Sequence, residues 1–123
     1  FMSHSKNYIY HLDEFSGSDM IEFQSCDLPE RRKFSDPASL YVEDTVFYFY
    51  FETLFQKVVS DFDMFDYTVI TRNQWHLIML LDLSSLLDID TDELQLIQRT
   101  LSGIDCWVAE NVSEGGSFLV MGV

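Results

Sequence analysis

Carboxylates are the most abundant reactive groups in this chain, and residues 61–67 combine three of them with three aromatic rings. Closely spaced carboxylates could bind calcium, so an ion site is the first chemistry to consider. An EF-hand loop needs Asp at positions one, three and five, Gly at six and Glu at twelve. Counted from Asp61, these last three positions hold Phe65, Asp66 and Arg72. The spacing fails at three points, and the sequence predicts no calcium loop.

Histidines and cysteines form no recognisable motif either. His4, His11 and His76 lack the HxxxH and HExxH spacings of metal sites. Cys26 and Cys106 are far apart and belong to no CxxC pair, so we expect two buried thiols rather than a disulfide. Cys26 with His11 is the only Cys/His pair worth naming, and composition alone supports it. With no GxSxG or phosphate-binding glycine loop, we expect no catalytic residue, metal or cofactor, and predict that the chain is not an enzyme.

The charge balance is strongly acidic. The chain has 21 Asp and Glu against 7 Lys and Arg, a net charge of −14. This balance argues against binding to nucleic acid or to an anionic membrane, because both need clustered basic residues. Negative charge speeds association with basic partners, although it also serves solubility alone. We therefore expect a basic protein partner.

The length of 123 residues fits one domain spanning residues 1–123. No apolar run approaches the ~20 residues of a transmembrane helix. The first residues are polar after Met2, which we interpret as the natural start, and they lack the apolar core of a signal peptide. The sequence therefore predicts a cytoplasmic protein.

Hydrophobic periodicity predicts an α+β fold in which three main helices pack with a small sheet. The expected elements are helices at about residues 45–60, 72–83 and 91–111, an N-terminal strand at 7–15, a second strand at 20–23 that could pair back on it, and a closing strand at 117–123. In the first helix the run VFYFYF also has β propensity. The spacing of apolar residues from Phe47 to Phe62 nevertheless follows one helical face. In the third helix the apolar positions also recur every three or four residues, at Leu94, Ile97, Leu101, Ile104 and Val108.

Short polar motifs predict where these elements begin and end. Asp44 is a candidate N-cap, Thr71 with Gln74 forms a capping box for the second helix, and Asp90 with Glu93 is a cap signal for the third. Gly103 marks a place where the third helix could kink. Residues 16–19 read as a turn, residues 26–38 as a loop, and 68–70 as a short extended stretch. The closing strand has no polar side chain after its first residue, which is typical of an interior strand.

Acidic residues cluster at the two breaks between helices. If the helices pack antiparallel, these breaks lie at opposite ends and make two patches. Helix N-terminal chemistry explains part of the second cluster, but the first follows a helix, where negative charge is unfavourable. The candidate partner-binding residues are Asp61, Asp63, Phe65, Asp66 and Tyr67 at the first break and Asp82, Asp88, Asp90, Asp92 and Glu93 at the second.

The order of features from residue 44 to 123 resembles a known group of proteins. The segments DFDMFDY and TVITRNQW are followed by a helix bearing Trp107 and by the terminal strand SFLVMGV. This order resembles small bacterial immunity proteins of polymorphic and contact-dependent-inhibition toxin systems. The resemblance implies a protein that binds a toxin and blocks its active site. Such toxins are often nucleases with basic clefts, which suits an acidic inhibitor.

Two alternatives remain open at this point. A phage or mobile-element protein could mimic nucleic acid by its charge and bind many basic proteins. A small enzyme is the less favoured alternative. The exposed aromatics also leave a homodimer open.

Overall fold

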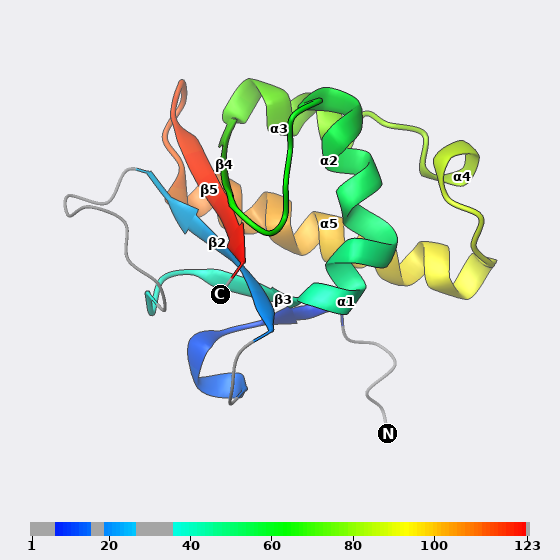
Figure 1. The fold of residues 1–123 in the computed structure, drawn as a ribbon, viewed down its shortest axis with the longest axis horizontal. Helices are drawn as coiled ribbons and strands as arrows, with labels where there is room; N and C mark the ends of the chain where they lie inside the picture. Colours follow the sequence, from blue (N-terminus) through cyan, green and yellow to red (C-terminus); the bar gives the residue numbers. More distant parts are fainter. Residues whose placement is uncertain (1–6, 16–18, 27–35, 123) are drawn as a thin grey trace.

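A five-stranded antiparallel sheet forms the framework of the molecule (Figure 1). The computed structural model describes residues 7–15, 19–26 and 36–122. The strands are β1 (Ile9–Tyr10), β2 (Met20–Ser25), β3 (Leu40–Glu43), β4 (Tyr67–Thr71) and β5 (Ser117–Gly122). Their order is β1-β3-β2-β5-β4, and every neighbouring pair is antiparallel. Strands from both halves of the chain therefore meet at the centre, and β4 forms one edge.

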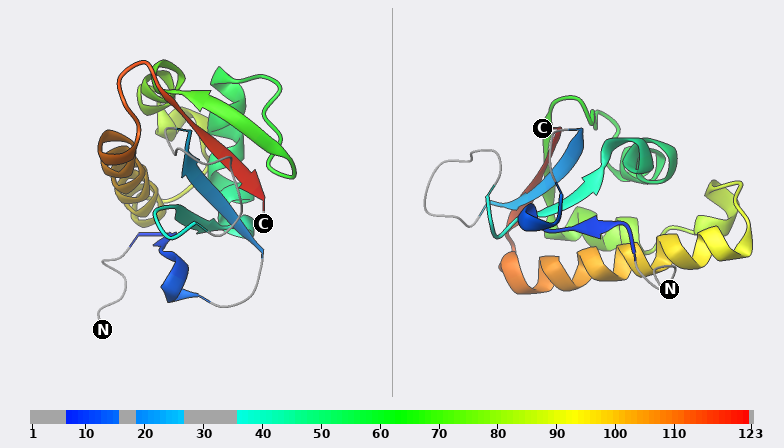
Figure 2. Two further views of the ribbon diagram at one scale, coloured as in Figure 1. Left: turned by 90° about the vertical axis from the view of Figure 1, so that its left-hand side faces the viewer. Right: turned by 90° about the horizontal axis from the view of Figure 1, so that it is seen from below.

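The longest helices pack on one face of the sheet, as two further views show (Figure 2). The helical elements are a 3-10 helix (Leu12–Glu14), α1 (Asp44–Val46), a π-helical turn (Phe47–Phe51), α2 (Glu52–Val58), α3 (Arg72–Met79), α4 (Leu83–Leu86) and α5 (Thr91–Asn111). Because α1, the π-helical turn and α2 are continuous, they form the single helix expected at about 45–60. The predicted α+β class is confirmed.

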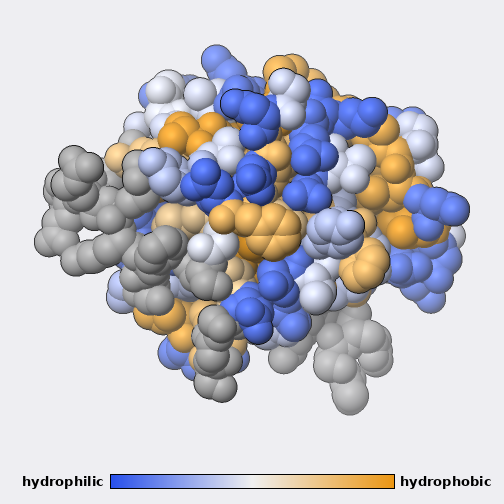
Figure 3. All heavy atoms as spheres, viewed as in Figure 1, coloured by the Kyte–Doolittle hydropathy of each residue, from blue (hydrophilic) through white to orange (hydrophobic). Residues whose placement is uncertain are grey.

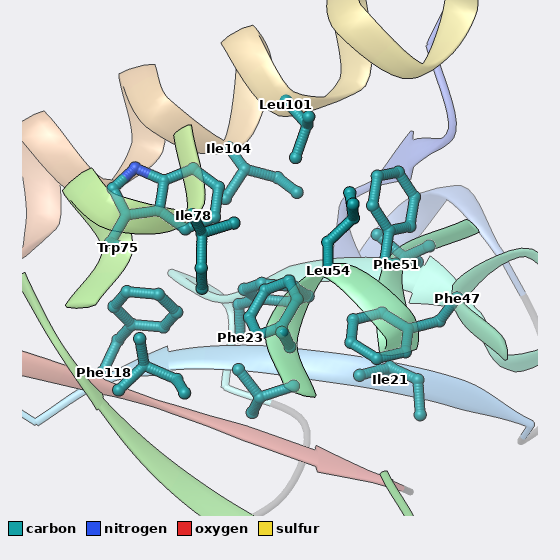
Figure 4. Close-up of a cluster of buried hydrophobic side chains, with 14 of the residues drawn as sticks. Ile21, Phe23, Phe47, Phe51, Leu54, Trp75, Ile78, Leu101, Ile104 and Phe118 are labelled. Carbon is teal, nitrogen blue, oxygen red and sulfur yellow. The ribbon is translucent and has the colours of Figure 1, made fainter. Parts of the chain in front are cut away.

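The core between helices and sheet is built from large aromatic side chains (Figure 4). Phe23 of β2 is fully buried, and its ring centroid lies 6.1 Å from that of Phe47 and 5.9 Å from that of Phe118. The first pair is edge-to-face and the second is stacked, and both arrangements are favourable for aromatic rings. The buried residues join in one contiguous cluster. No helix in the described part of the chain has the length and apolar character needed to cross a membrane.

The predicted helical faces are buried as expected. Phe47, Phe51, Leu54 and Phe55 face the core from the first helix. Along α5, the buried stripe contains Ile97, Leu101, Ile104 and Val108. Spacings of three and four residues place each set on one side of its helix, which explains why the pattern alone located them.

Two of the predicted helix caps are confirmed. The Thr71 hydroxyl accepts a hydrogen bond from Gln74 N at 3.1 Å, and the Gln74 side chain accepts one from Thr71 N at 2.9 Å. Asp90 caps α5 by accepting from Glu93 N at 2.8 Å. The prediction for Asp44 is wrong, because that residue already lies in the first turn and the cap position makes no side-chain hydrogen bond.

The second and third helices differ in detail from their predictions. The second ends at Met79, short of residue 83, and the chain turns before starting the separate α4. The third runs without interruption through Gly103. A side chain at Gly103 would place its Cβ 2.5 Å from Ile9 Cδ1, so the glycine allows β1 to approach the helix closely.

The sheet contains more than the predicted strands. β3 was not predicted at all, and the extended stretch 68–70 belongs to β4. The predicted bounds of the first strand, 7–15, are wrong, because β1 covers only Ile9–Tyr10 and a 3-10 helix follows at Leu12–Glu14. β2 pairs with β3 and β5 rather than with this first strand. β5 is paired on both sides, as its apolar sequence indicated. Most of the predicted turn at 16–19 and of the loop at 26–38 lies outside the described residues.

Candidate functional site

The segment joining α2 to β4 presents the first acidic cluster. Its side chains alternate between core and solvent: Phe62 and Met64 are buried, whereas Asp61, Asp63 and Phe65 are exposed. The Phe62 ring centroid lies 5.1 Å from that of Phe55 in α2. Burial of the two apolar residues thus anchors the segment and turns the intervening residues outward.

Two aspartates of this segment also stabilise its backbone. Asp63 Oδ1 accepts a hydrogen bond from Phe65 N at 2.9 Å. Asp66 Oδ1 accepts one from Tyr67 N at 2.8 Å. Such short-range bonds are the usual role of Asp in turns. Asp63 and Asp66 therefore have a local function that the sequence pattern did not reveal, while no described residue donates a hydrogen bond to the Asp61 side chain.

Apolar side chains are exposed beside these carboxylates. Phe65 is 80% exposed, Tyr67 51% and Val69 47%. On the face of the molecule drawn in Figure 3, hydrophobic atoms lie among hydrophilic ones near the centre. We call the set Asp61, Asp63, Phe65, Asp66, Tyr67 and Val69 the turn–edge surface. Val69 is absent from the residues predicted from sequence, although the two-residue period of a strand places it on the same side as Tyr67.

The second acidic cluster lies around α4 and the start of α5. We call Asp82, Asp88, Asp90, Asp92 and Glu93 the helix-start surface. All are exposed except the partly buried Glu93. Met79, Leu81, Leu83, Leu94 and Leu101 contribute to a nearby groove of about 300 Å³, with Asp82 among its lining residues.

Several acids of the helix-start surface have structural roles. Asp90 caps α5, and Asp82 accepts a hydrogen bond from the Ser84 hydroxyl at 2.9 Å. Tyr50 donates to Glu93 Oε2 at 2.7 Å, and this bond is the largest cause of the raised pKa of the Tyr50 phenol. Local hydrogen bonds therefore involve three of the five acids of this surface, and two of the three acids of the turn–edge surface.

The two surfaces lie on different parts of the molecule. The turn–edge surface is beside β4, whereas the helix-start surface surrounds α4, as the two sets of views show (Figures 1 and 2). The structure brings the members of each cluster together and does not bring one cluster to the other.

Cysteine and histidine do not form a reactive pair in the structure. Cys26 and Cys106 are both exposed, so the prediction of buried thiols is wrong. His11 shares a shallow groove of about 370 Å³ with Cys106 instead of Cys26. Glu14, which also lines it, accepts a hydrogen bond from the His11 backbone N at 2.7 Å. No described residue links the Cys106 thiol to a base by a hydrogen bond, which nucleophilic catalysis requires.

One buried carboxylate lies on the opposite face of the sheet. Glu22 is fully buried and accepts hydrogen bonds at 3.2 Å from Gln24 Nε2 and from Asp36 N. Burial, and then the neighbouring Glu22, raises the pKa of the Tyr41 phenol. Within the described ranges, no group of three or more His, Cys, Asp or Glu could hold a metal ion.

Comparison with known proteins gives no relative for this chain. No family model, curated protein or solved structure matches it. The two surfaces and the resemblance of residues 44–123 are therefore the basis for the function proposed below.

Proposed function

We propose that this chain is a cytoplasmic immunity protein that binds a cognate toxin and neutralises it by covering its active site. The toxin is expected to be a basic protein, most simply a nuclease domain. The net charge of −14 supports a basic partner, since complementary charge accelerates encounter and disfavours wrong partners. The order of sequence features from residue 44 onward supports the immunity class. No catalytic role is part of the proposal.

The observation that carries the proposal is the composition of the turn–edge surface. Exposed Phe65 and Tyr67 lie among Asp61, Asp63 and Asp66. Aromatic residues are typical anchors of protein interfaces, and complete burial of one Phe side chain contributes roughly 1.5–3 kcal/mol. The surrounding carboxylates would form the polar rim that meets a basic cleft.

Charge also connects this surface to nuclease inhibition. A nuclease binds phosphates through Lys and Arg, and an acidic protein presents carboxylates to the same groups. An inhibitor placed there excludes the nucleic acid by occupying its binding surface. The inhibitor needs no contact with the catalytic atoms themselves.

The test uses the protein domain encoded by the reading frame next to this one. The purified domain is expected to form a stable complex with this chain, and the complex is expected to lose the toxic activity of the domain. Co-expression is expected to restore growth to cells that produce the domain. Absence of both binding and protection would contradict the proposal.

Unrelated basic nucleases provide the control for specificity. An immunity protein binds its own toxin tightly and the others weakly. Salt-sensitive binding of similar strength to several unrelated nucleases would instead assign the chain to the nucleic-acid mimics.

A further inference from the structure

The two edge strands of the sheet differ in length and in what lies against them. β1 is two residues long and lies against α5, where Tyr8 N donates to the Thr100 hydroxyl at 3.0 Å. β4 is five residues long and ends the sheet on the other side. Uncovered edge strands can pair with an extended segment from another protein. The backbone of β4 is therefore the candidate binding edge.

Hydrogen bonds already present show which β4 residues face outward. Arg72 N donates to Gly116 O at 3.0 Å, one step beyond the last pair of the β4–β5 ladder. Hydrogen-bonded and non-bonded pairs alternate along an antiparallel ladder, so the even-numbered residues of β4 bond to β5. The odd-numbered residues turn their backbone groups to the outer edge, and these are Tyr67, Val69 and Thr71.

Side-chain oxygens accept hydrogen bonds from the outward N–H groups at both ends of this edge. Tyr67 N donates to Asp66 Oδ1 at 2.8 Å, and Thr71 N donates to Gln74 Oε1 at 2.9 Å. Between them, the N–H of Val69 has no hydrogen-bond acceptor among the described residues. The edge thus offers a short binding position, centred on Val69 and bounded on each side.

The chemistry around this position indicates what would occupy it. The segment 60–66 runs beside β4 in both sets of views (Figures 1 and 2) and contributes exposed Asp61, Asp63 and Phe65. An added strand would therefore have three carboxylates and three exposed apolar side chains close to it. A second copy of this chain fits poorly, because two molecules of net charge −14 repel each other.

We propose that β4 receives an extended, basic segment of the toxin as an added strand, paired through the backbone of Val69. This inference rests on the proposed function and specifies how the partner is held. Lys or Arg of the segment lies near the carboxylates, and its apolar side chains contact Tyr67 and Val69. Backbone pairing selects an extended segment, which charge alone cannot do.

The test compares Val69→Pro with Val69→Ala, using the toxin domain from the adjoining reading frame. Proline removes the outward N–H and is tolerated at an edge position that donates no hydrogen bond within the sheet. Alanine shortens the side chain and keeps the N–H. Loss of one backbone bond, with an unsatisfied carbonyl left in the partner, is expected to make Val69→Pro bind about tenfold more weakly than Val69→Ala.

A second measurement, made on the wild type, does not depend on whether the proline variant folds. Amide hydrogen exchange at Val69 of the wild type is expected to slow strongly when the toxin domain binds. Unchanged exchange at Val69, or equal binding by a folded Val69→Pro variant, would overturn the edge inference while leaving the proposed function intact. Failure of the wild type to bind the domain would overturn both.

Sedimentation of the free protein completes the experiment. The wild type is expected to be monomeric. A dimer that Val69→Pro dissociates would assign the edge to a second copy and overturn the inference of a toxin segment.

Discussion

Neutralising the turn–edge carboxylates should weaken partner binding without weakening the fold. The variant is Asp61→Asn, Asp63→Asn and Asp66→Asn in one chain. Asparagine keeps the side-chain oxygens that accept from Phe65 N and Tyr67 N, at 2.9 and 2.8 Å in the native turn. The substitutions therefore remove three negative charges while preserving the turn that presents them.

The expected loss of affinity follows from the number of charges. Two unit charges 4 Å apart in water attract by about 1 kcal/mol. Measured exposed pairs contribute about 0.2–1 kcal/mol each, so three pairs give roughly 0.6–3 kcal/mol. Because each 1.4 kcal/mol changes affinity about tenfold, the dissociation constant should rise roughly threefold to a hundredfold. Most of the change is expected in the association rate.

The free energy of unfolding should rise slightly or stay unchanged. These carboxylates follow the C-terminus of α2, where the helix dipole makes negative charge unfavourable. Surface substitutions of this kind usually change the unfolding free energy by less than about 0.5 kcal/mol. Thermal unfolding should therefore give nearly the same midpoint for the variant and the wild type.

The assay is a titration of the toxin domain at several salt concentrations, with stopped-flow measurement of association. The matched control carries Asp13→Asn, Glu110→Gln and Glu114→Gln, three exposed positions outside the turn–edge surface. It makes the same change in net charge. Equal losses of affinity in both triple variants would show that total charge is responsible and would refute the assignment of this surface. A large fall in the unfolding midpoint would show that these acids are mainly structural.

Two further predictions concern the framework of the sites. Tyr50→Phe removes the bond to Glu93 and should lower the unfolding free energy by about 1 kcal/mol in urea titrations. The pKa of the Tyr50 phenol is raised in the folded state. The stability that the bond contributes is therefore fully present below the unfolded-state pKa near 10 and is lost as the pH rises through the folded-state pKa. The difference in unfolding free energy between wild type and variant should consequently shrink only in alkali. Gly122→Ala would place a Cβ 2.9 Å from Met64 O, so it should displace the 60–66 segment, lower the melting temperature and weaken toxin binding; unchanged binding in the calorimeter would argue against that coupling.

Local patterns predicted the parts of the fold that local interactions determine. The capping box at Thr71 needs only residues within one helical turn, and the stripe along α5 needs only a period of 3.6 residues. The sequence could not show that Leu40–Glu43 forms β3, because its ladder partners are distant in the chain. The role of Gly103 was also ambiguous in the sequence. Helix propensity alone allows a kink there, whereas in the structure Ile9 packs closely against the glycine.

The candidate site was predictable in its composition and not in its arrangement. The sequence located Asp61, Asp63 and Asp66 and noted that a helix end gives negative charge no stabilisation. It could not show that two of these acids accept turn hydrogen bonds, since that depends on the backbone path set by buried Phe62 and Met64. Because Asp63 and Asp66 accept hydrogen bonds within the turn, their presence can be explained without a binding partner.

Charge and backbone pairing have separate roles in the proposed complex. Carboxylates attract any basic protein, and their effect is screened within a Debye length of about 10 Å at 0.1 M salt. They therefore raise the encounter rate without selecting one toxin among several basic proteins. The short edge at Val69 and the neighbouring aromatic side chains act only after encounter, on a segment that can extend and fit between Asp66 and Gln74. Charge variants should consequently change association with many basic proteins, whereas Val69→Pro should accelerate dissociation from the cognate toxin alone.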